Sequence, residues 1–220
     1  MLANNPFINI TSTGKEKVVD RVNERIELQL YINDGLSHGK IIIIKGNPGV
    51  GKSTLINTII NDLKKTRTVE FIKEEFTPSV YNRLRTINIM PMKKILIVLD
   101  DFNNVELLDK TSQTKVLNLM DELAQKACVI VVENRNEGVE KDFKKLGKRF
   151  EKFELSGLQR SDLRQLIVDR LNSIRQVPRD NLDPFTEEEY DKIFRKAGGN
   201  PRIALLICST LYDQKETSII

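Results

Sequence analysis

The chain has 220 residues, of which 40% are hydrophobic and 30% charged, and 35 basic against 31 acidic residues give a net charge of +4. This composition is typical of a folded globular protein with one full domain, or one domain and a small appendage. The mild basic excess permits a polyanionic partner without establishing one. No apolar run approaches the roughly 20 residues of a membrane span, and no apolar stretch follows Met1. We therefore expect a cytoplasmic protein with no membrane partner.

Histidine and cysteine are scarce in the sequence. The single histidine, His38, leaves no material for a His-based metal centre or for a Ser-His catalytic pair. Cys128 and Cys208 lie in apolar contexts, which favours buried free thiols over a disulfide or a metal site. Metal hydrolases and histidine-dependent hydrolases are therefore disfavoured.

The first two thirds of the chain alternate between strand and helix patterns. Residues 1–16 are polar and indicate an arm, and apolar positions then recur at helical spacing from Val18 to Leu36, where His38-Gly39 ends the predicted helix. Continuous apolar runs predict buried strands at Ile41–Ile44, Ile95–Leu99 and Cys128–Val132. Two short strand candidates lie at Thr68–Ile72 and Phe150–Leu155. Helices are predicted between them at Ser53–Leu63, Leu107–Ala124 and in the charged stretch that ends near Gly147, whereas Phe76–Ile87 is either weakly helical or mostly a connection.

After Gly157 only helical patterns follow, at Ser161–Ile174, Thr186–Lys196 and Pro201–Leu211. Alternating strands and helices predict a parallel sheet with helices on both faces. We therefore expect an α/β fold with two parts. The first is a sheet domain over residues 1–156, which includes the arm and first helix (1–38), and the second is a small helical subdomain over residues 157–220.

A glycine-rich turn joins the first predicted strand to the helix at Ser53–Leu63. Its residues, Gly46-Asn47-Pro48-Gly49-Val50-Gly51-Lys52-Ser53, fit the phosphate-loop pattern G-x-x-x-x-G-K-[ST] in full, and Thr54 follows. Glycines let backbone N–H groups approach phosphates, and the helix N-terminus adds its dipole. Lys52 suits the β- and γ-phosphates of ATP, and the Ser53 hydroxyl suits Mg²⁺. Because both spacing and context are satisfied, a chance glycine turn is the weaker interpretation.

Polar residues follow two of the predicted strands. Asp100-Asp101 closes the run Ile95–Leu99, where Asp100 suits the Mg²⁺ shell and Asp101 suits the orientation or deprotonation of the attacking water. An ordinary acidic turn is the alternative, which the phosphate loop makes weaker. Asn134 follows Cys128–Val132 and either hydrogen-bonds the γ-phosphate or the water, or belongs to an ordinary polar loop.

Four segments resemble the AAA+ and STAND branch of the P-loop ATPases, and above all archaeal-type ATPases related to replication initiators of the origin-recognition family. Three of them lie before the helical tail: Val22-Asn23-Glu24-Arg25-Ile26-Glu27-Leu28, which is similar to an adenine-supporting segment; GNPGVGKST; and ILIVLDD, whose doubled aspartate is closer to STAND proteins. The fourth, Gly198-Gly199-Asn200-Pro201-Arg202, resembles the start of a lid helix. The resemblance implies a P-loop sheet of strand order 5-1-4-3-2 with a helical lid.

The resemblance also implies roles for single residues. Val22 lies in the adenine segment, Asn134 matches the polar sensor on the fourth strand, and Arg202 matches the lid arginine that senses the γ-phosphate. Arg149 lies near the position where such families carry an arginine finger, which acts in trans in a homo-oligomer. A solvated basic face is the alternative interpretation of Arg149.

The chain ends at Ile220, whereas the initiators usually continue into a winged-helix DNA-binding domain and STAND proteins into sensor or effector domains. We expect either a minimal family member or a fragment. The resemblance implies an ATPase that binds and slowly hydrolyses Mg²⁺-ATP as a conformational or assembly switch, with double-stranded DNA or a replication protein as partner.

Two other functions stay open. One is a STAND-type regulatory ATPase that acts on a protein partner without binding DNA. The other is a small-molecule or nucleoside kinase, which leaves the Val22–Leu28 segment and Arg202 unexplained.

Overall fold

The computed structural model describes residues 5–8, 21–66, 69–87, 89, 93–134, 138–145 and 150–217. The chain divides into two compact units. The sheet unit comprises Val22–Gly46 and Leu55–Leu155. The helical unit comprises Ser156–Ile220, the loop segment Asn47–Thr54 and the N-terminal residues through Arg21.

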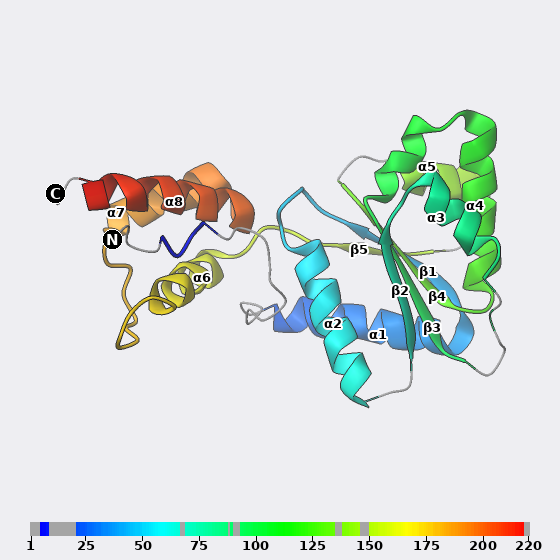
Figure 1. Cartoon of the computed structure of the whole chain (residues 1–220), viewed down its shortest axis with the longest axis horizontal. Helices are drawn as coiled ribbons and strands as arrows, with labels where there is room; N and C mark the ends of the chain where they lie inside the picture. The colour runs from blue at the N-terminus through cyan, green and yellow to red at the C-terminus, as the bar shows by residue number, and fades with distance from the viewer. Residues whose placement is uncertain are drawn as a thin grey trace. The chain divides into compact units, whose positions relative to one another are not determined.

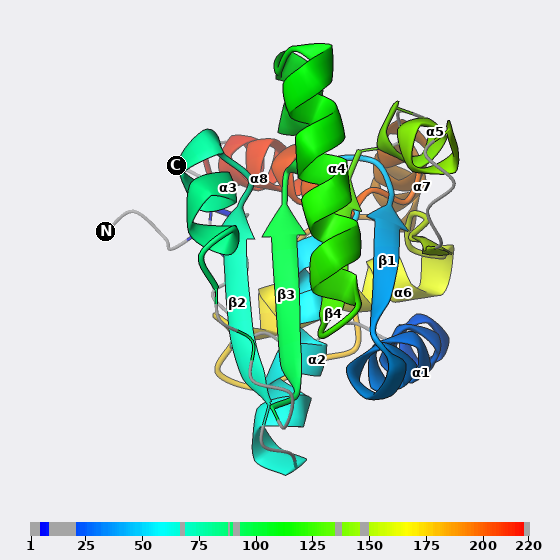
Figure 2. The same ribbon diagram turned by 90° about the vertical axis from the view of Figure 1, so that its right-hand side faces the viewer.

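The sheet unit is built on five strands that all pair in parallel. Their bounds are β1 (Lys40–Lys45), β2 (Glu70–Glu75), β3 (Ile95–Asp100), β4 (Cys128–Glu133) and β5 (Glu151–Glu154). Their order is β2-β3-β4-β1-β5, and Figure 2 shows the carboxyl ends of the parallel strands at one edge of the sheet. This confirms the predicted fold class and strand order.

Helices cover both faces of this sheet, with α1 and α2 on one face and α3, α4 and α5 on the other (Figure 1). Their bounds are α1 (Val22–His38), α2 (Lys52–Thr66), α3 (Pro78–Leu84), α4 (Lys110–Ala124) and α5 (Gly138–Lys145), with a 3₁₀ helix η1 at Phe102–Leu107. The two-sided cover explains why the central strands are continuous apolar runs, because neither face meets water.

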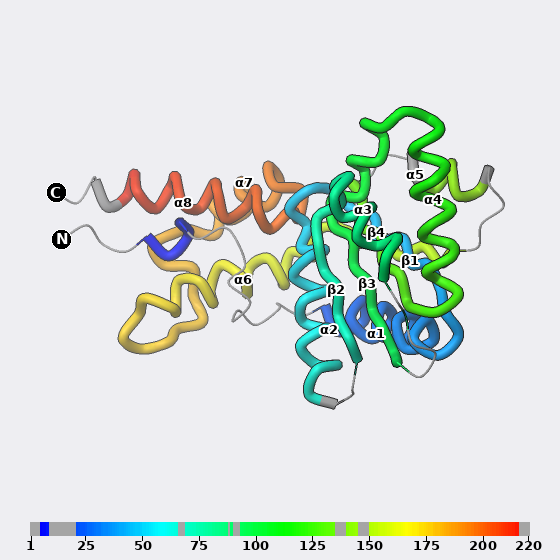
Figure 3. Tube along the Cα trace, turned by 45° about the vertical axis from the view of Figure 1, so that its right-hand side comes forward, coloured from blue at the N-terminus to red at the C-terminus, as the bar shows by residue number. Residues whose placement is uncertain are grey.

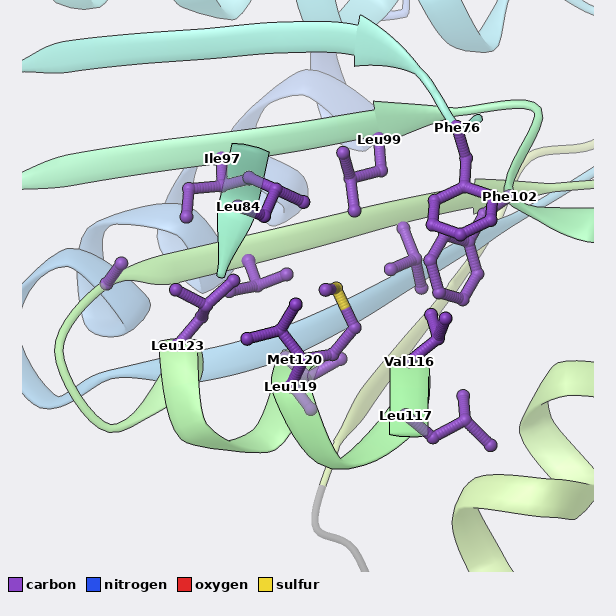
Figure 4. Close-up of a cluster of buried hydrophobic side chains, with 14 of the residues drawn as sticks. Phe76, Leu84, Ile97, Leu99, Phe102, Val116, Leu117, Leu119, Met120 and Leu123 are labelled. Atoms are coloured by element: carbon purple, nitrogen blue, oxygen red, sulfur yellow. The ribbon is translucent and has the colours of Figure 1, made fainter. Parts of the chain in front are cut away.

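Alternate residues of the central strands enter a core under α3 and α4. Figure 4 shows Ile97 and Leu99 of β3 directed toward Met120 and Leu123 of α4. Phe76 and Phe102 meet edge to face above the strand ends, with ring centroids 5.0 Å apart. This packing fixes the carboxyl edge of the sheet, where the polar residues of interest lie.

The bounds of several predicted elements differ from those observed; α3, for example, is confined to Pro78–Leu84, and two further shifts have an identifiable cause. The strand expected at Thr68–Ile72 is β2 at Glu70–Glu75, an edge strand whose half-exposed, charge-rich sequence carries a weak apolar signal; Thr68 lies outside the described residues. The helix expected at Leu107–Ala124 begins only at Lys110, because Asp109 caps it by accepting a hydrogen bond from the Ser112 N–H at 3.0 Å.

The helical unit contains the three helices that the sequence predicts, α6 (Arg160–Asn172), α7 (Glu187–Ala197) and α8 (Pro201–Thr217), of which α8 continues beyond the predicted end at Leu211. Its core joins apolar side chains from all three helices, such as Leu163, Ile193 and Ala204. Thr186 and Glu189 form a reciprocal capping box at the start of α7, and Gly198 ends that helix in the left-handed conformation.

Part of the N-terminal arm is built into the helical unit. Phe7 is fully buried between Phe185 and Tyr212, and Asn5 Nδ2 donates hydrogen bonds to Ser209 Oγ at 3.0 Å and Asp213 Oδ1 at 2.8 Å. Figure 3 shows this segment beside α8. The sequence assigned the arm to the sheet domain, whereas its described residues pack in the helical unit. The division at residues 156 and 157 stays a prediction.

The predicted free thiols are confirmed, since Cys128 and Cys208 are buried and unpaired with each other. Burial raises the pKa of each to about 12, so neither thiol carries charge at neutral pH. Over the described part of the chain, no helix combines the length and the apolarity that a membrane crossing requires.

Candidate functional site

The phosphate loop follows β1 directly and leads into α2. Gly49 and Gly51 adopt φ values of 84° and 103°, which side chains other than glycine rarely tolerate, so the glycines at these spacings are a backbone requirement. The Val50 N–H bonds the Asn47 carbonyl at 3.3 Å and closes a turn within the loop. A helix N-terminus at Lys52 then supplies a positive dipole end to the loop, which is the combination that binds phosphate.

Lys52 is the cation of this loop. Its residue is only 9% exposed, and Nζ donates to the Asn47 carbonyl at 3.3 Å, so the ammonium is folded back over the loop. Ser53 and Thr54 follow in the first turn of α2. The Ser53 hydroxyl is a hard oxygen donor of the kind that Mg²⁺ prefers.

A lid residue holds the phosphate loop in place within the helical unit. Asn200 is 7% exposed, and its Nδ2 donates to the Pro48 carbonyl at 2.8 Å. Its Oδ1 accepts from the backbone N–H groups of Arg202 and Ile203 at 3.1 and 3.3 Å, which caps α8. One side chain therefore couples the loop backbone to the start of the lid helix. The sequence pattern includes Asn200 only within the segment that resembles the start of a lid helix, and its position directly before Pro201 is the local signal for a helix cap.

The loop and the lid helix approach so closely that a side chain does not fit between them. A Cβ added at Gly49 would lie 2.7 Å from Arg202 Cβ and 2.9 Å from Asn200 Oδ1. Arg202 is exposed, and its Cδ would lie 3.2 Å from the same added atom, so the first part of its side chain runs beside the loop. The structure thus brings the Arg202 side chain and the phosphate loop together, whereas the role of Arg202 as a γ-phosphate sensor stays a prediction.

Sequence reasoning missed Arg21 altogether. This arginine is 5% exposed, and its guanidinium donates to the Val50 carbonyl at 3.0 Å and to the Ser156 carbonyl at 2.8 Å. It ties the phosphate loop to the first residue of the helical unit's main segment. No local pattern singles out Arg21, because its partners lie far away in the sequence.

We expect Asn200→Ala to lower the free energy of unfolding of the helical unit by about 1–2 kcal/mol, because it removes a helix cap and leaves the Pro48 carbonyl without this donor. Urea titration measures this change, and nucleotide titration should show weaker binding in parallel. Gln176→Ala, which removes an exposed amide of the same unit, is the control and should change neither quantity. Equal stability of Asn200→Ala and the wild type would remove Asn200 from this role.

The sheet unit carries the acidic pair at its carboxyl edge. Asp100 is the half-buried last residue of β3, and its Oδ1 accepts from the Asp101 N–H at 3.1 Å. Asp101 is exposed and adopts the left-handed conformation, with φ 47° and ψ 38°; of the non-glycine residues that the structure describes, it alone has positive φ. Aspartate tolerates this conformation better than most residues, and such outliers gather at functional sites.

The remaining predicted residues fall in three places. Asn134 directly follows β4, the strand between β1 and β3, and is half-buried. Val22 is the first residue of α1 and is 47% exposed. Arg149 lies outside the described residues, so its role as an arginine finger stays a prediction.

Known proteins give this arrangement a family. The sequence model of the family described as Novel STAND NTPase 3 matches residues 31–175, which is more than half of the chain. The chain belongs to this family. The match spans the phosphate loop, the acidic pair and Asn134, so the nucleoside-triphosphatase assignment rests on the segment that contains them.

Solved structures of other proteins share the fold of this STAND NTPase. Drosophila ORC bound to DNA matches with a TM-score of 0.70 and 17% identity, over 98% of this chain and 61% of that chain. The Aeropyrum pernix ORC1 protein in complex with DNA matches with a TM-score of 0.67 and 14% identity, over 96% and 64%. At these identities the likeness shows the fold alone, and it confirms the predicted resemblance in fold to origin-recognition proteins.

A curated relative is the DNA repair protein RadA of Helicobacter pylori, 28% identical over 97 residues, which are 44% of this chain and 21% of the relative. This STAND NTPase therefore spans less than two thirds of the length of each of these three proteins.

Proposed function

We propose that the chain binds Mg²⁺-ATP and hydrolyses it slowly, as a cytoplasmic conformational or assembly switch in DNA replication or a related DNA transaction. The observation that carries the proposal is the contact of the lid with the phosphate loop, through Asn200 and Pro48 at 2.8 Å, in a chain of a STAND NTPase family. A loop held by the lid is suited to report which nucleotide is bound, because phosphate contacts and lid contacts share the same backbone.

The donor chemistry of the chain fits this ligand. Positive-φ glycines leave room for backbone N–H groups to meet the phosphates, and Lys52 neutralises the β- and γ-oxygens. The Ser53 hydroxyl and the Asp100 carboxylate are the oxygen donors proposed for Mg²⁺. When bound, the metal ion withdraws charge from the phosphates and thereby assists the transfer.

The proposed reaction is attack of water on the γ-phosphoryl group. The water oxygen bonds to phosphorus while the bond from phosphorus to the β–γ bridging oxygen breaks, so ADP leaves with that electron pair and inorganic phosphate forms. Asp101 orients the water or accepts its proton, and Asn134 holds the γ-phosphate or the water. Lys52 and Arg202 stabilise the charge that develops on the phosphoryl oxygens.

The DNA partner is supported by two observations of unequal kind. The ORC and ORC1 structures that share the fold contain DNA, as their names state. The chain carries a net charge of +4, which favours a polyanion weakly. A homo-oligomer completed by a trans arginine belongs to the same proposal.

The alternative is a STAND-type regulatory ATPase that acts on a protein partner without binding DNA. The family match and the doubled aspartate, Asp100-Asp101, favour it. The two functions share the nucleotide chemistry and differ only in what the switch binds.

Fluorescence anisotropy with duplex DNA, at stepped salt and with ATP or ADP, separates the two functions. The DNA proposal expects nucleotide-dependent binding that weakens steeply as salt rises, because phosphate contacts release counterions. Binding that is absent even at low ionic strength would leave the regulatory ATPase. Light scattering of the same samples should show a larger assembly with ATP than with ADP if a neighbouring subunit contributes an arginine.

A further inference from the structure

A buried cluster of charged residues lies at the carboxyl edge of the sheet and has no part in the nucleotide chemistry described above. We call it the Lys45 cluster; its members are Lys45, Glu133 and Glu140. Lys45 of β1 and Glu133 of β4 are neighbours in the strand register, and their side chains are 4% and 1% exposed. Lys45 Nζ lies 3.1 Å from Glu133 Oε1 and 2.8 Å from Glu140 Oε2 on α5.

The Lys45 cluster has one shared ammonium group for two carboxylates, and the negative charges of these carboxylates are not equally compensated. Glu140 also meets Lys144 at 2.6 Å and Lys152 of β5 at 3.6 Å, and Lys144 followed by Lys45 lowers its pKa to about 2. Glu140 is therefore ionised at any pH at which the protein works.

Glu133 is the carboxylate whose charge is less well compensated. Burial raises its pKa to about 7, Lys45 opposes that effect, and the charges of Glu106 on η1 and Glu140 on α5 add to it. Within the part of the chain that the structure describes, no donor is aligned for a hydrogen bond to Glu133 Oε1, so Lys45 meets this oxygen as a charge. Ionisation of Glu133 is therefore costly in the interior of the sheet.

The position of the pair in the chain is informative. Lys45 immediately precedes Gly46, the first residue of the phosphate loop, and Glu133 immediately precedes Asn134. On the other side of Lys45, its register partner in β5 is Glu154, whose side chain is 45% exposed and pairs with Lys152. The buried contact therefore joins the two strands that lead into predicted site residues, whereas the β5 partner stays in solvent.

We propose that the Lys45–Glu133 pair is a positioning element for nucleotide hydrolysis, which fixes the ends of β1 and β4 relative to each other so that Gly46 and Asn134 are held in the geometry that turnover needs. Ionised Glu133 is the active form, because only the carboxylate holds Lys45 against β4 rather than leaving it to Glu140. The inference rests on the proposed ATP hydrolysis.

The stability of Glu133→Gln distinguishes this positioning role from a purely structural one, in which the Lys45–Glu133 salt bridge would stabilise the fold. The pKa of Glu133 is about 7 in the folded chain against 4.5 for an ordinary glutamate, so the folded state takes up a proton at higher pH than the unfolded state does. The contribution of Glu133 to stability therefore increases as pH falls from about 7 to about 4.5, and the ionised form opposes folding above that window. Glutamine mimics the protonated acid. Glu133→Gln should consequently be at least as stable as the wild type at pH 8, a result that loss of a stabilising salt bridge would not give.

The experiment compares the full chain with Glu133→Gln, Lys45→Met and the double variant Lys45→Met/Glu133→Gln. The double variant is included because Lys45→Met alone leaves a buried carboxylate without its cation and can fail to fold. Glu154→Gln is the matched control. It also removes a carboxylate at the end of a strand that pairs with β1, but Glu154 is an exposed register partner of Lys45. The measurements are ATP affinity, kcat from about pH 6 to about pH 8.5, and urea unfolding at the two ends of that range.

The expected result separates turnover from binding. Glu133→Gln should bind ATP within about threefold of the wild type, yet lower kcat about 10- to 100-fold. Wild-type kcat should fall as pH decreases through about 7, and that dependence should be absent from Glu133→Gln. The double variant should be no slower than Glu133→Gln, because both substitutions remove the same contact. Glu154→Gln should match the wild type throughout.

Three results would overturn the inference. One is a Glu133→Gln variant whose kcat stays within about threefold of the wild type, at an ATPase activity that the wild type clearly shows. Another is loss of ATP affinity in step with kcat, which assigns the pair to loop folding instead. The third is a wild-type chain that binds ATP without hydrolysing it, and this result alone overturns the proposed hydrolysis as well.

Discussion

Lys52→Ala is expected to lower ATP affinity by about 100-fold, as measured by equilibrium titration with a fluorescent ATP analogue. A charge-assisted hydrogen bond contributes about 1.5–3 kcal/mol, and each 1.4 kcal/mol is about tenfold in affinity. Lys52 is 9% exposed and folded over the loop at Asn47, so its ammonium group is already held at the loop backbone. Alanine is a good helix former at the start of α2, and the fold should remain intact.

Lys65→Ala is the matched control for this prediction. Lys65 lies on the same helix, its side chain is 75% exposed, and it pairs loosely with Asp62 at 3.8 Å. Its removal takes the same charge from the protein and should leave ATP affinity unchanged, because exposed charges at this distance are screened. If Lys52→Ala and Lys65→Ala bound ATP equally well, the phosphate-loop assignment would be wrong.

The phosphate loop and the sheet were predictable because each depends on a local pattern. The glycine spacing from Gly46 to Gly51 reports a backbone that other residues rarely adopt, and the apolar runs at Ile41–Ile44 and Ile95–Leu99 report strands buried on both faces. The strand order was available only through the family resemblance, since strands of similar composition can pair in many orders.

Elements at the margin of the core were harder to predict. The edge strand β2 contains Glu70, Lys73, Glu74 and Glu75, so its apolar periodicity is weak and its bounds were misplaced. Leu107 belongs to η1 and is 84% exposed, which made an apolar residue a misleading helix signal. Where burial does not select the side chains, the sequence pattern carries little information about structure.

The contacts that organise the candidate site are largely long-range, and that is why sequence reasoning missed them. Arg21 reaches Val50 and Ser156, and Asn200 reaches Pro48, across large separations in the chain. The Lys45–Glu133 contact exists because parallel strands bring the two residues into register. A lysine before a phosphate loop and a glutamate before Asn134 look like two ordinary polar strand ends until the register is known.

Asp101→Asn is expected to preserve ATP binding and to lower kcat by about 10²- to 10⁴-fold, the range that general base catalysis supplies. The substitution isolates the charge, because asparagine tolerates the left-handed conformation that Asp101 adopts at φ 47°, and the backbone N–H that bonds Asp100 is retained. Phosphate release under single-turnover conditions measures the chemical step, and a parallel ATP titration tests binding.

Asp62→Asn, a carboxylate of α2 that pairs with Lys65, is the control and should turn over at the wild-type rate. The pair of strand-end aspartates also predicts a contrast between neighbours. Turnover by Asp100→Asn should increase as the Mg²⁺ concentration is raised, because a neutral amide is a weaker magnesium ligand than a carboxylate. Added Mg²⁺ should not restore turnover by Asp101→Asn. Rescue of both variants by Mg²⁺ would place both aspartates at the metal, and normal turnover of Asp101→Asn would move the base elsewhere. Glu133 is the other carboxylate at a strand end that is a candidate general base, but its side chain is only 1% exposed and pairs with Lys45. The exposed Asp101 is therefore better placed than Glu133 to meet a water molecule.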